Sequence, residues 1–163
     1  MVAVGLATAI ARLHEAEAAG WGASARPFMF VQVSGLALFA GLVGAAIALA
    51  RRGEWHQRLM LAATASLMQA PMGRIPFLIL HGVAPGQSPA DFAPPAVGLI
   101  VFPELAVNLF LLAGIIRDVR TRGRPHPAWI VGVVSIAVVT LLRWPLSGTD
   151  AWLATADWLG RLV

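Results

Sequence analysis

The sequence predicts an all-α membrane protein, a four-helix bundle with a short amphipathic helix at each end. Its 163 residues are 58% hydrophobic and only 12% charged, whereas a soluble domain carries about 25% charged residues. Four apolar stretches are each long enough to cross a bilayer, which takes about 20 helical residues. Four such helices in so short a chain leave nothing polar to cover them in water. We therefore expect one membrane domain over residues 1–163.

The first expected element is an amphipathic helix at about 2–18. Its apolar residues Leu6, Ile10 and Leu13 recur at helical spacing. The segment has no basic start of the kind that opens a signal peptide, and it is too charged by Glu17 to span. We expect a helix that lies in the membrane interface; the alternative is a frayed terminus.

Four apolar spans follow. They are expected at about 28–50, 59–83, 95–116 and 128–146. In the first span, Ala37, Gly41 and Ala45 form a row of small residues that allows close helix approach. Such a row serves either the bundle interior or an interface between subunits. No internal repeat accompanies the four spans.

The last expected element is a second interfacial helix at about 149–162. Trp152, Ala156 and Leu159 share one helical face. Trp152 and Trp158 also suit the boundary between membrane and water, where tryptophan is enriched. Both ends of the chain are therefore expected to rest on the membrane surface.

The arginines indicate an orientation. All twelve basic residues are Arg, and seven lie in the two loops that join spans one to two and three to four: Arg51, Arg52, Arg58, Arg117, Arg120, Arg122 and Arg124. The positive-inside rule makes both loops cytoplasmic and both termini external. The acidic Glu54 and Asp118 in these loops are expected to moderate local charge. No nucleic-acid partner is expected, because no aromatic or Gly-rich binding pattern accompanies the basic residues.

Polar side chains from all four spans fall at similar depths. Measured from the cytoplasmic side, Arg74 and Arg143 lie about 24 Å along their spans and Glu104 about 20 Å. Gln32 shares this layer, while Gln69 and Asn108 lie somewhat deeper. A charge inside a span costs roughly 3 kcal/mol on insertion scales unless it faces protein or water. We expect Glu104 to pair with Arg74, Arg143 or both.

Two interpretations of this polar layer stay open. It is either a salt-bridge network that fixes the bundle, or a cavity, open outward, for an anionic or carbonyl-bearing molecule such as a lipid headgroup, quinone, haem propionate or small carboxylate. Kink-forming prolines adjoin the charges, since Pro71 and Pro76 flank Arg74, and this favours a cavity. His81 lies on the same face as Arg74, about 10 Å further out, where it could join a bound ligand.

His56 and His126 lie at the cytoplasmic mouth of spans two and four, and Met60 follows His56 by one turn. A b-type haem takes axial ligands from facing helices at matched depth, so the two histidines are candidate ligands of a haem iron. The alternative for His126, which stands between two prolines, is a solvated interfacial histidine.

The stretch from His56 reads HQRLMLAAT, and a later one reads GRPHPA. Together they resemble uncharacterised small bacterial inner-membrane proteins with an H-x-R-L-M-L-x-A-T opening and a G-R-x-H-P-A entrance. The chain is also faintly similar to small four-helix proteins of cytochrome oxidase assembly, which share a His-x-x-x-Met span start. This second resemblance implies haem-side roles for His56, Met60 and His126. The location implied is the bacterial inner membrane.

Three functions remain. The first is a bundle that binds a hydrophobic or anionic cofactor or lipid, such as haem or quinone, for electron transfer or cofactor handling. The second is a structural or accessory subunit that associates with other membrane subunits or with itself. The third is a small oligomeric transporter or membrane enzyme. No familiar catalytic motif marks an enzyme, so whether the chain is one stays open.

Overall fold

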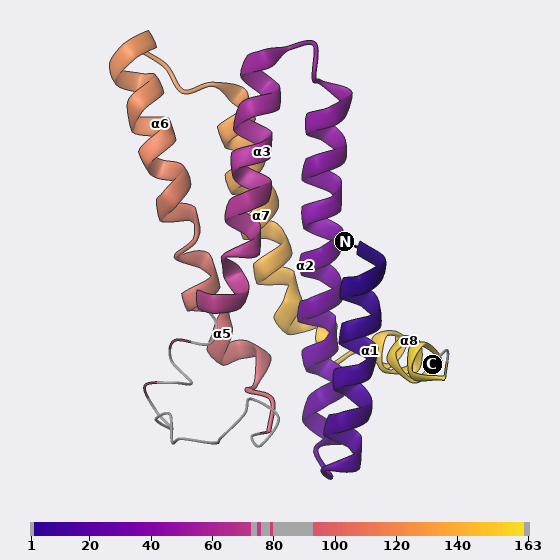
Figure 1. The fold of residues 1–163 in the computed structure, drawn as a ribbon. Helices are drawn as coiled ribbons and strands as arrows, with labels where there is room; N and C mark the ends of the chain where they lie inside the picture. The colour runs from indigo at the N-terminus through magenta and orange to yellow at the C-terminus, as the bar shows by residue number, and fades with distance from the viewer. Residues whose placement is uncertain (1, 73–74, 76–78, 80–92, 162–163) are drawn as a thin grey trace.

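The computed structural model describes residues 2–72, 75, 79 and 93–161, and in these residues it is helical without strands. The described helices are α1 (Val2–Ala18), α2 (Gly22–Ala48), α3 (Gly53–Leu67), α5 (Val97–Leu105), α6 (Asn108–Arg122), α7 (Pro127–Ser147) and α8 (Asp150–Gly160) (Figure 1). The predicted all-α class is confirmed.

Helices α2, α3 and α7 and the stacked pair α5–α6 run alternately up and down (Figure 1). Helix α7 is central, because it contacts α2, α3, α5 and α6. The connections α2–α3 and α6–α7 lie at the same end (Figure 1), which brings the two arginine-rich segments together there. We call this the Arg-rich end.

Two helices, α2 and α7, are long and apolar enough by themselves to cross a membrane. Helix α3 ends at Leu67, where Pro71, four residues on, has no N–H to donate to the Leu67 carbonyl. A short helical stretch resumes at 69–72, and the remainder of the second expected span lies outside the described residues.

The third expected span is interrupted. Helix α5 ends at Leu105 and α6 begins at Asn108. Between them the backbone tightens into i→i+3 bonds, with the Val107 N–H donating to the Glu104 carbonyl at 3.2 Å and the Phe110 N–H to the Val107 carbonyl at 3.1 Å. One continuous helix over 95–116 was expected, and the structure replaces it with two.

The terminal helices both pack on the start of α2. Helix α1 runs back along α2 (Figure 1), and its Ile10 and Leu13 bury against Ala25 and Met29. It therefore packs lengthwise on α2. That the helix at 2–18 lies in a membrane interface stays a prediction. Helix α8 is seen nearly end-on in Figure 1, across the axis of the others. Its Ala156 joins the same cluster.

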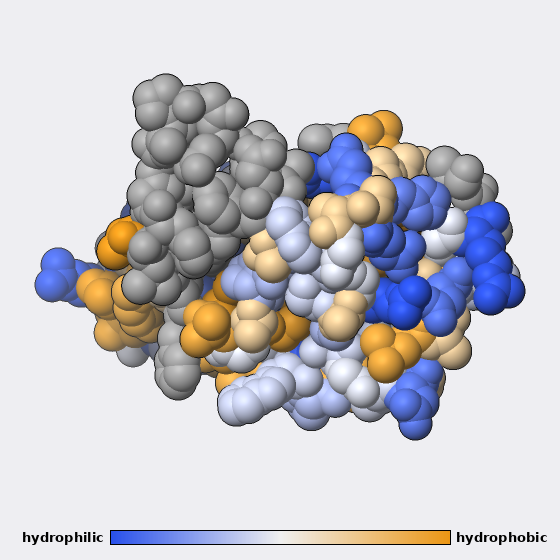
Figure 2. Space-filling view, turned by 90° about the horizontal axis from the view of Figure 1, so that it is seen from below, coloured by the Kyte–Doolittle hydropathy of each residue, from blue (hydrophilic) through white to orange (hydrophobic). Residues whose placement is uncertain are grey.

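The distribution of polarity is the reverse of that in a soluble bundle. Large apolar side chains face outward, among them Leu109, which is 65% exposed, and Trp144, which is 69% exposed. Arg143 and Glu104 are instead buried, at 1% and 2% exposure. Figure 2 views the end opposite the Arg-rich end, where hydrophilic side chains gather on the side of α1, α2 and α8.

Candidate functional site

Arg143 on α7 is the centre of a buried polar network. Its Nη1 pairs with the Glu104 carboxylate from α5, and its Nε donates to Ser34 Oγ of α2 at 2.9 Å. Its Nη2 donates to Gln69 Oε1 at 3.3 Å. Gln69 Nε2 in turn donates to Thr140 Oγ1 at 2.6 Å. The guanidinium thus holds four segments of the chain together.

Only some of the residues expected in the polar layer are bonded to one another in the structure. Gln69, Glu104 and Arg143 come together, and Glu104 takes Arg143, one of the two partners expected. The buried Oδ1 of Asn108 accepts no hydrogen bond from the described residues. Gln32 is half-buried on α2, and no bond links it to the described network. Two further members of the expected set, Arg74 and His81, lie outside the described residues.

The network leaves Arg143 no exposed face. Beside it, a Cβ built on Gly35 would lie 3.1 Å from Arg143 Nη2, so the glycine permits α2 to approach the guanidinium closely. An enclosed cation that is bonded through all three of its nitrogens does not offer an exposed binding surface. This arrangement favours the structural interpretation of the layer.

The candidate haem ligands have other partners. His56 Nδ1 lies 2.9 Å from the Ala46 carbonyl. His126 Nδ1 accepts the Ala128 N–H at 3.1 Å and caps α7. Burial and then the nearby Arg58 lower the pKa of His126, which keeps the ring neutral for this role. Met60 is 36% exposed.

In the part of the chain that the structure describes, no three His, Cys, Asp or Glu side chains form a metal-binding group. The edge of the Trp55 ring packs on His126, with the ring centroids 5.2 Å apart. The structure therefore shows capping and packing roles for His126, and its role toward a haem iron stays a prediction.

A second buried cluster lies at the Arg-rich end. Arg58 on α3 donates from Nε and Nη2 to the two carboxylate oxygens of Asp118 on α6, both at 2.9 Å. The Trp129 indole N–H of α7 donates to the same carboxylate at 2.9 Å. The bonds from Arg58 hold the pKa of Asp118 at about 2.

Sequence reasoning missed this cluster. Asp118 was expected to moderate charge in a loop, yet it is buried and joins three helices. The signal that could have found it was the shared depth of Arg58 and Asp118, each within about one turn of the predicted cytoplasmic boundary.

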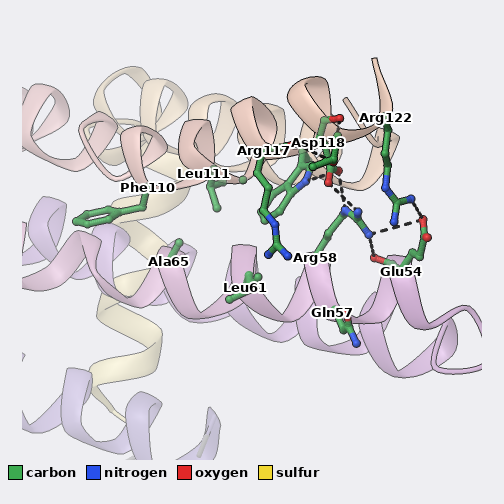
Figure 3. Close-up of a pocket in the computed structure, with 13 residues that line it drawn as sticks. Glu54, Gln57, Arg58, Leu61, Ala65, Phe110, Leu111, Arg117, Asp118 and Arg122 are labelled. Atoms are coloured by element: carbon green, nitrogen blue, oxygen red, sulfur yellow. Dashed lines mark hydrogen bonds and ion pairs between the residues drawn. The ribbon is translucent and has the colours of Figure 1, made fainter. Parts of the chain in front are cut away.

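Next to this cluster, a cavity of about 700 Å³ opens between α3 and α6 (Figure 3). Its outer part holds charged side chains: Glu54, Arg58, Arg117, Asp118 and Arg122. Its deeper part is apolar: Leu61, Ala65, Phe110, Leu111 and Gly114. The cavity thus changes from ionic to apolar along its length.

Two ion pairs form the rim and wall of the cavity. Glu54 pairs with Arg122 at 2.6 Å, and the hydrogen bond from Arg122 lowers the pKa of Glu54. The Arg58–Asp118 pair forms the wall of the cavity toward α7. On the same side, Gly114 of α6 has no side chain, so the Trp129 ring of α7 can lie against α6. A Cβ built at Gly114 would lie 2.4 Å from that ring. The cavity shape therefore depends on this glycine.

Comparison with protein-family models, with curated protein sequences and with solved structures found no match to this chain.

Proposed function

We propose that the protein is a four-span membrane protein that binds a hydrophobic, anionic molecule in the cavity between α3 and α6. The observation that carries the proposal is this cavity, which has cationic side chains at its mouth and an apolar wall beyond them. Ligand sites are typically concave and mostly apolar, with a few placed polar groups, and have volumes of about 300–1,000 Å³.

The membrane setting is supported by the reversed polarity of the bundle. A helix in lipid exposes apolar side chains and turns its rare charges toward protein. The chain follows this pattern, with Leu109 and Trp144 outside and Arg143 inside. In this proposal α2 and α7 are complete spans. Segments 59–83 and 95–116 are the other two, because the backbone break between α5 and α6 is tolerated where protein surrounds it.

The proposed site is not the polar layer that the sequence singled out. Arg143 is buried, and each of its three guanidinium nitrogens is already bonded, to Glu104, Ser34 or Gln69. The α3–α6 cavity, by contrast, is open and lies at the level of the arginine-rich loops. The polar layer then stabilises the bundle, and binding occurs nearer the cytoplasmic surface.

Haem does not fit this cavity. An axial ligand of haem iron is a His, Met, Cys or Tyr side chain, and none of these lines the cavity in the described residues. Electron transfer through haem at this site is therefore not part of the proposal.

Native mass spectrometry with absorbance tests the proposal on protein extracted in mild detergent. We expect a retained organic molecule that is lost in Leu61→Trp, because the larger ring fills the cavity. Met60→Trp is the matched control, since Met60 is the neighbouring exposed residue on α3 and does not line the cavity. A wild-type protein without any retained molecule would overturn the proposal, and retention of a second protein chain instead would favour an accessory subunit.

A further inference from the structure

We propose that the molecule between α3 and α6 is an anionic phospholipid from the leaflet at the Arg-rich end, with its phosphate on Arg117. This rests on the proposed function and names the class of ligand for the same cavity. Three observations carry it: the charge balance of the cavity, the placement of Arg117, and the order of polar and apolar side chains along the two helices.

One arginine of the cavity has no carboxylate of its own to pair with. Three arginines and two carboxylates line the cavity. Arg58 pairs with Asp118, and Arg122 pairs with Glu54. Within the described residues, the guanidinium of Arg117 has neither an ion pair nor a hydrogen bond.

Figure 3 shows the Arg117 side chain extending from α6 toward α3, above Leu61. Arg117 is an exposed residue that lines the cavity, and its guanidinium borders the apolar part of it. A guanidinium binds phosphate through two parallel hydrogen bonds. This placement fits a phosphate that is attached to an apolar body.

The order of side chains matches a phospholipid. Along α3 the lining changes from Glu54 through Arg58 to Leu61 and Ala65, over about 16 Å of helix. Along α6 it changes in the same direction, from Arg122 to Phe110. A phospholipid presents a charged headgroup and then acyl chain in this order. A free phosphate would satisfy Arg117 but would leave the apolar part without a partner.

The level of the site also favours lipid. Basic pockets between spans on the cytoplasmic side are where anionic headgroups bind. Arg117 stands where the third span reaches that surface, one turn of α6 after the apolar Gly114. A headgroup from the adjoining leaflet reaches this level without leaving the membrane.

The test uses nanodiscs of equal parts phosphatidylglycerol and phosphatidylethanolamine, and identifies by native mass spectrometry the lipid that stays with the ejected protein. We expect wild type to retain phosphatidylglycerol preferentially, because phosphatidylethanolamine offsets the same phosphate with an ammonium group. Arg117→Gln should reduce this preference about fivefold, the usual contribution of one arginine near anionic lipid. Arg120→Gln is the matched control, because Arg120 is also an exposed arginine of α6 but lies outside the cavity. We expect it to behave as wild type.

Each other outcome counts against the lipid. If Arg117→Gln and Arg120→Gln lose the preference for phosphatidylglycerol equally, the protein is attracted diffusely to an anionic surface. If inorganic phosphate displaces the retained lipid, the cavity is a site for a free anion. Equal retention of the two lipids would also overturn the inference. If wild type retains a non-lipid molecule that Leu61→Trp removes, the proposed function stands and the lipid assignment falls. If nothing is retained, both fall.

Discussion

Arg143 and Arg58 are both buried arginines, and each is neutralised by one carboxylate on another helix. An arginine cannot lose its proton inside a protein, whereas a carboxyl can take one up. The two partners of such a pair are therefore unequal. Loss of the carboxylate leaves a buried cation, while loss of the arginine leaves a group that can become neutral.

Glu104→Gln is therefore expected to destabilise the protein more than Arg143→Gln. Breaking a buried pair typically costs about 3–5 kcal/mol, and we expect Glu104→Gln to fall in this range. Thermal melting in detergent measures the difference. The double variant Glu104→Leu with Arg143→Met should recover much of the loss, because it removes both charges. A Glu104→Gln protein that melts like wild type would mean that the pair does not hold the bundle.

The pKa of Asp118 makes stability depend on pH. Its value in the folded protein is about 2, below the ordinary 3.8, so the ionised carboxylate stabilises the fold. This contribution is complete above about pH 4 and is lost as the pH falls toward 2. We expect the melting temperature of wild type to fall over this range.

The variant Asp118→Asn should melt lower than wild type at neutral pH, and the gap should narrow below pH 4. Asp150→Asn at the exposed start of α8 is the control and should leave the pH profile unchanged. A gap that stays constant down to pH 2 would show that the ionised Asp118 carboxylate is not the stabilising group.

Sequence reasoning found the charged residues and the amide of the buried network and missed its two hydroxyl residues. Glu104, Gln69 and Arg143 are conspicuous because they interrupt apolar runs. Ser34 and Thr140 are not, since a hydroxyl in a helix is satisfied by a carbonyl of its own preceding turn. Only the folded structure shows that both also bond to the network.

At the scale of elements, α3 and α7 approach each other closely at one glycine. A Cβ built on Gly132 of α7 would lie 2.7 Å from the Cβ of Ala62 on α3. This distance is shorter than two carbon atoms tolerate, so the helices would have to move apart. The central position of α7 thus depends on a residue without a side chain.

We expect Gly132→Ala to destabilise the protein by about 1–3 kcal/mol, the usual cost of an overpacked core. Gly41→Ala on α2 is the control, because a Cβ there meets nothing within 4 Å. The control should be neutral or slightly stabilising, since Ala is the better helix former. Thermal melting of both variants measures the effect, and equal melting temperatures would contradict close packing of α3 on α7.

The periodicity of the sequence predicted which elements exist better than how they pack. Helices α2 and α7 are mostly apolar, and their length and composition mark them as candidate spans. The lengthwise packing of α1 on α2 depends on contacts far apart in the sequence, which periodicity does not encode. The small-residue row is a similar case, because Gly41 meets no neighbour in the described fold.

At the scale of the whole molecule, unpaired positive charge gathers at one end. At the opposite end, Arg26 is bound by Glu17 and Asp157. At the Arg-rich end, Arg51, Arg52, Arg120 and Arg124 have no ion pair within the described residues. Alternating helices bring both arginine-rich loops to this end (Figure 1). In a membrane, the positive-inside rule would then assign both loops to the same side.

This asymmetry predicts that the Arg-rich end is cytoplasmic, and cysteine labelling tests it cleanly because the chain has no Cys. Val119→Cys on α6 and Ala19→Cys after α1 place single thiols on exposed positions at the two ends without removing an arginine. In intact cells, a membrane-impermeant maleimide should label Ala19→Cys and leave Val119→Cys unmodified until the membrane is opened. Labelling of both in intact cells would mean mixed orientation. Labelling of Val119→Cys alone would place the Arg-rich end outside the cell and overturn the predicted orientation.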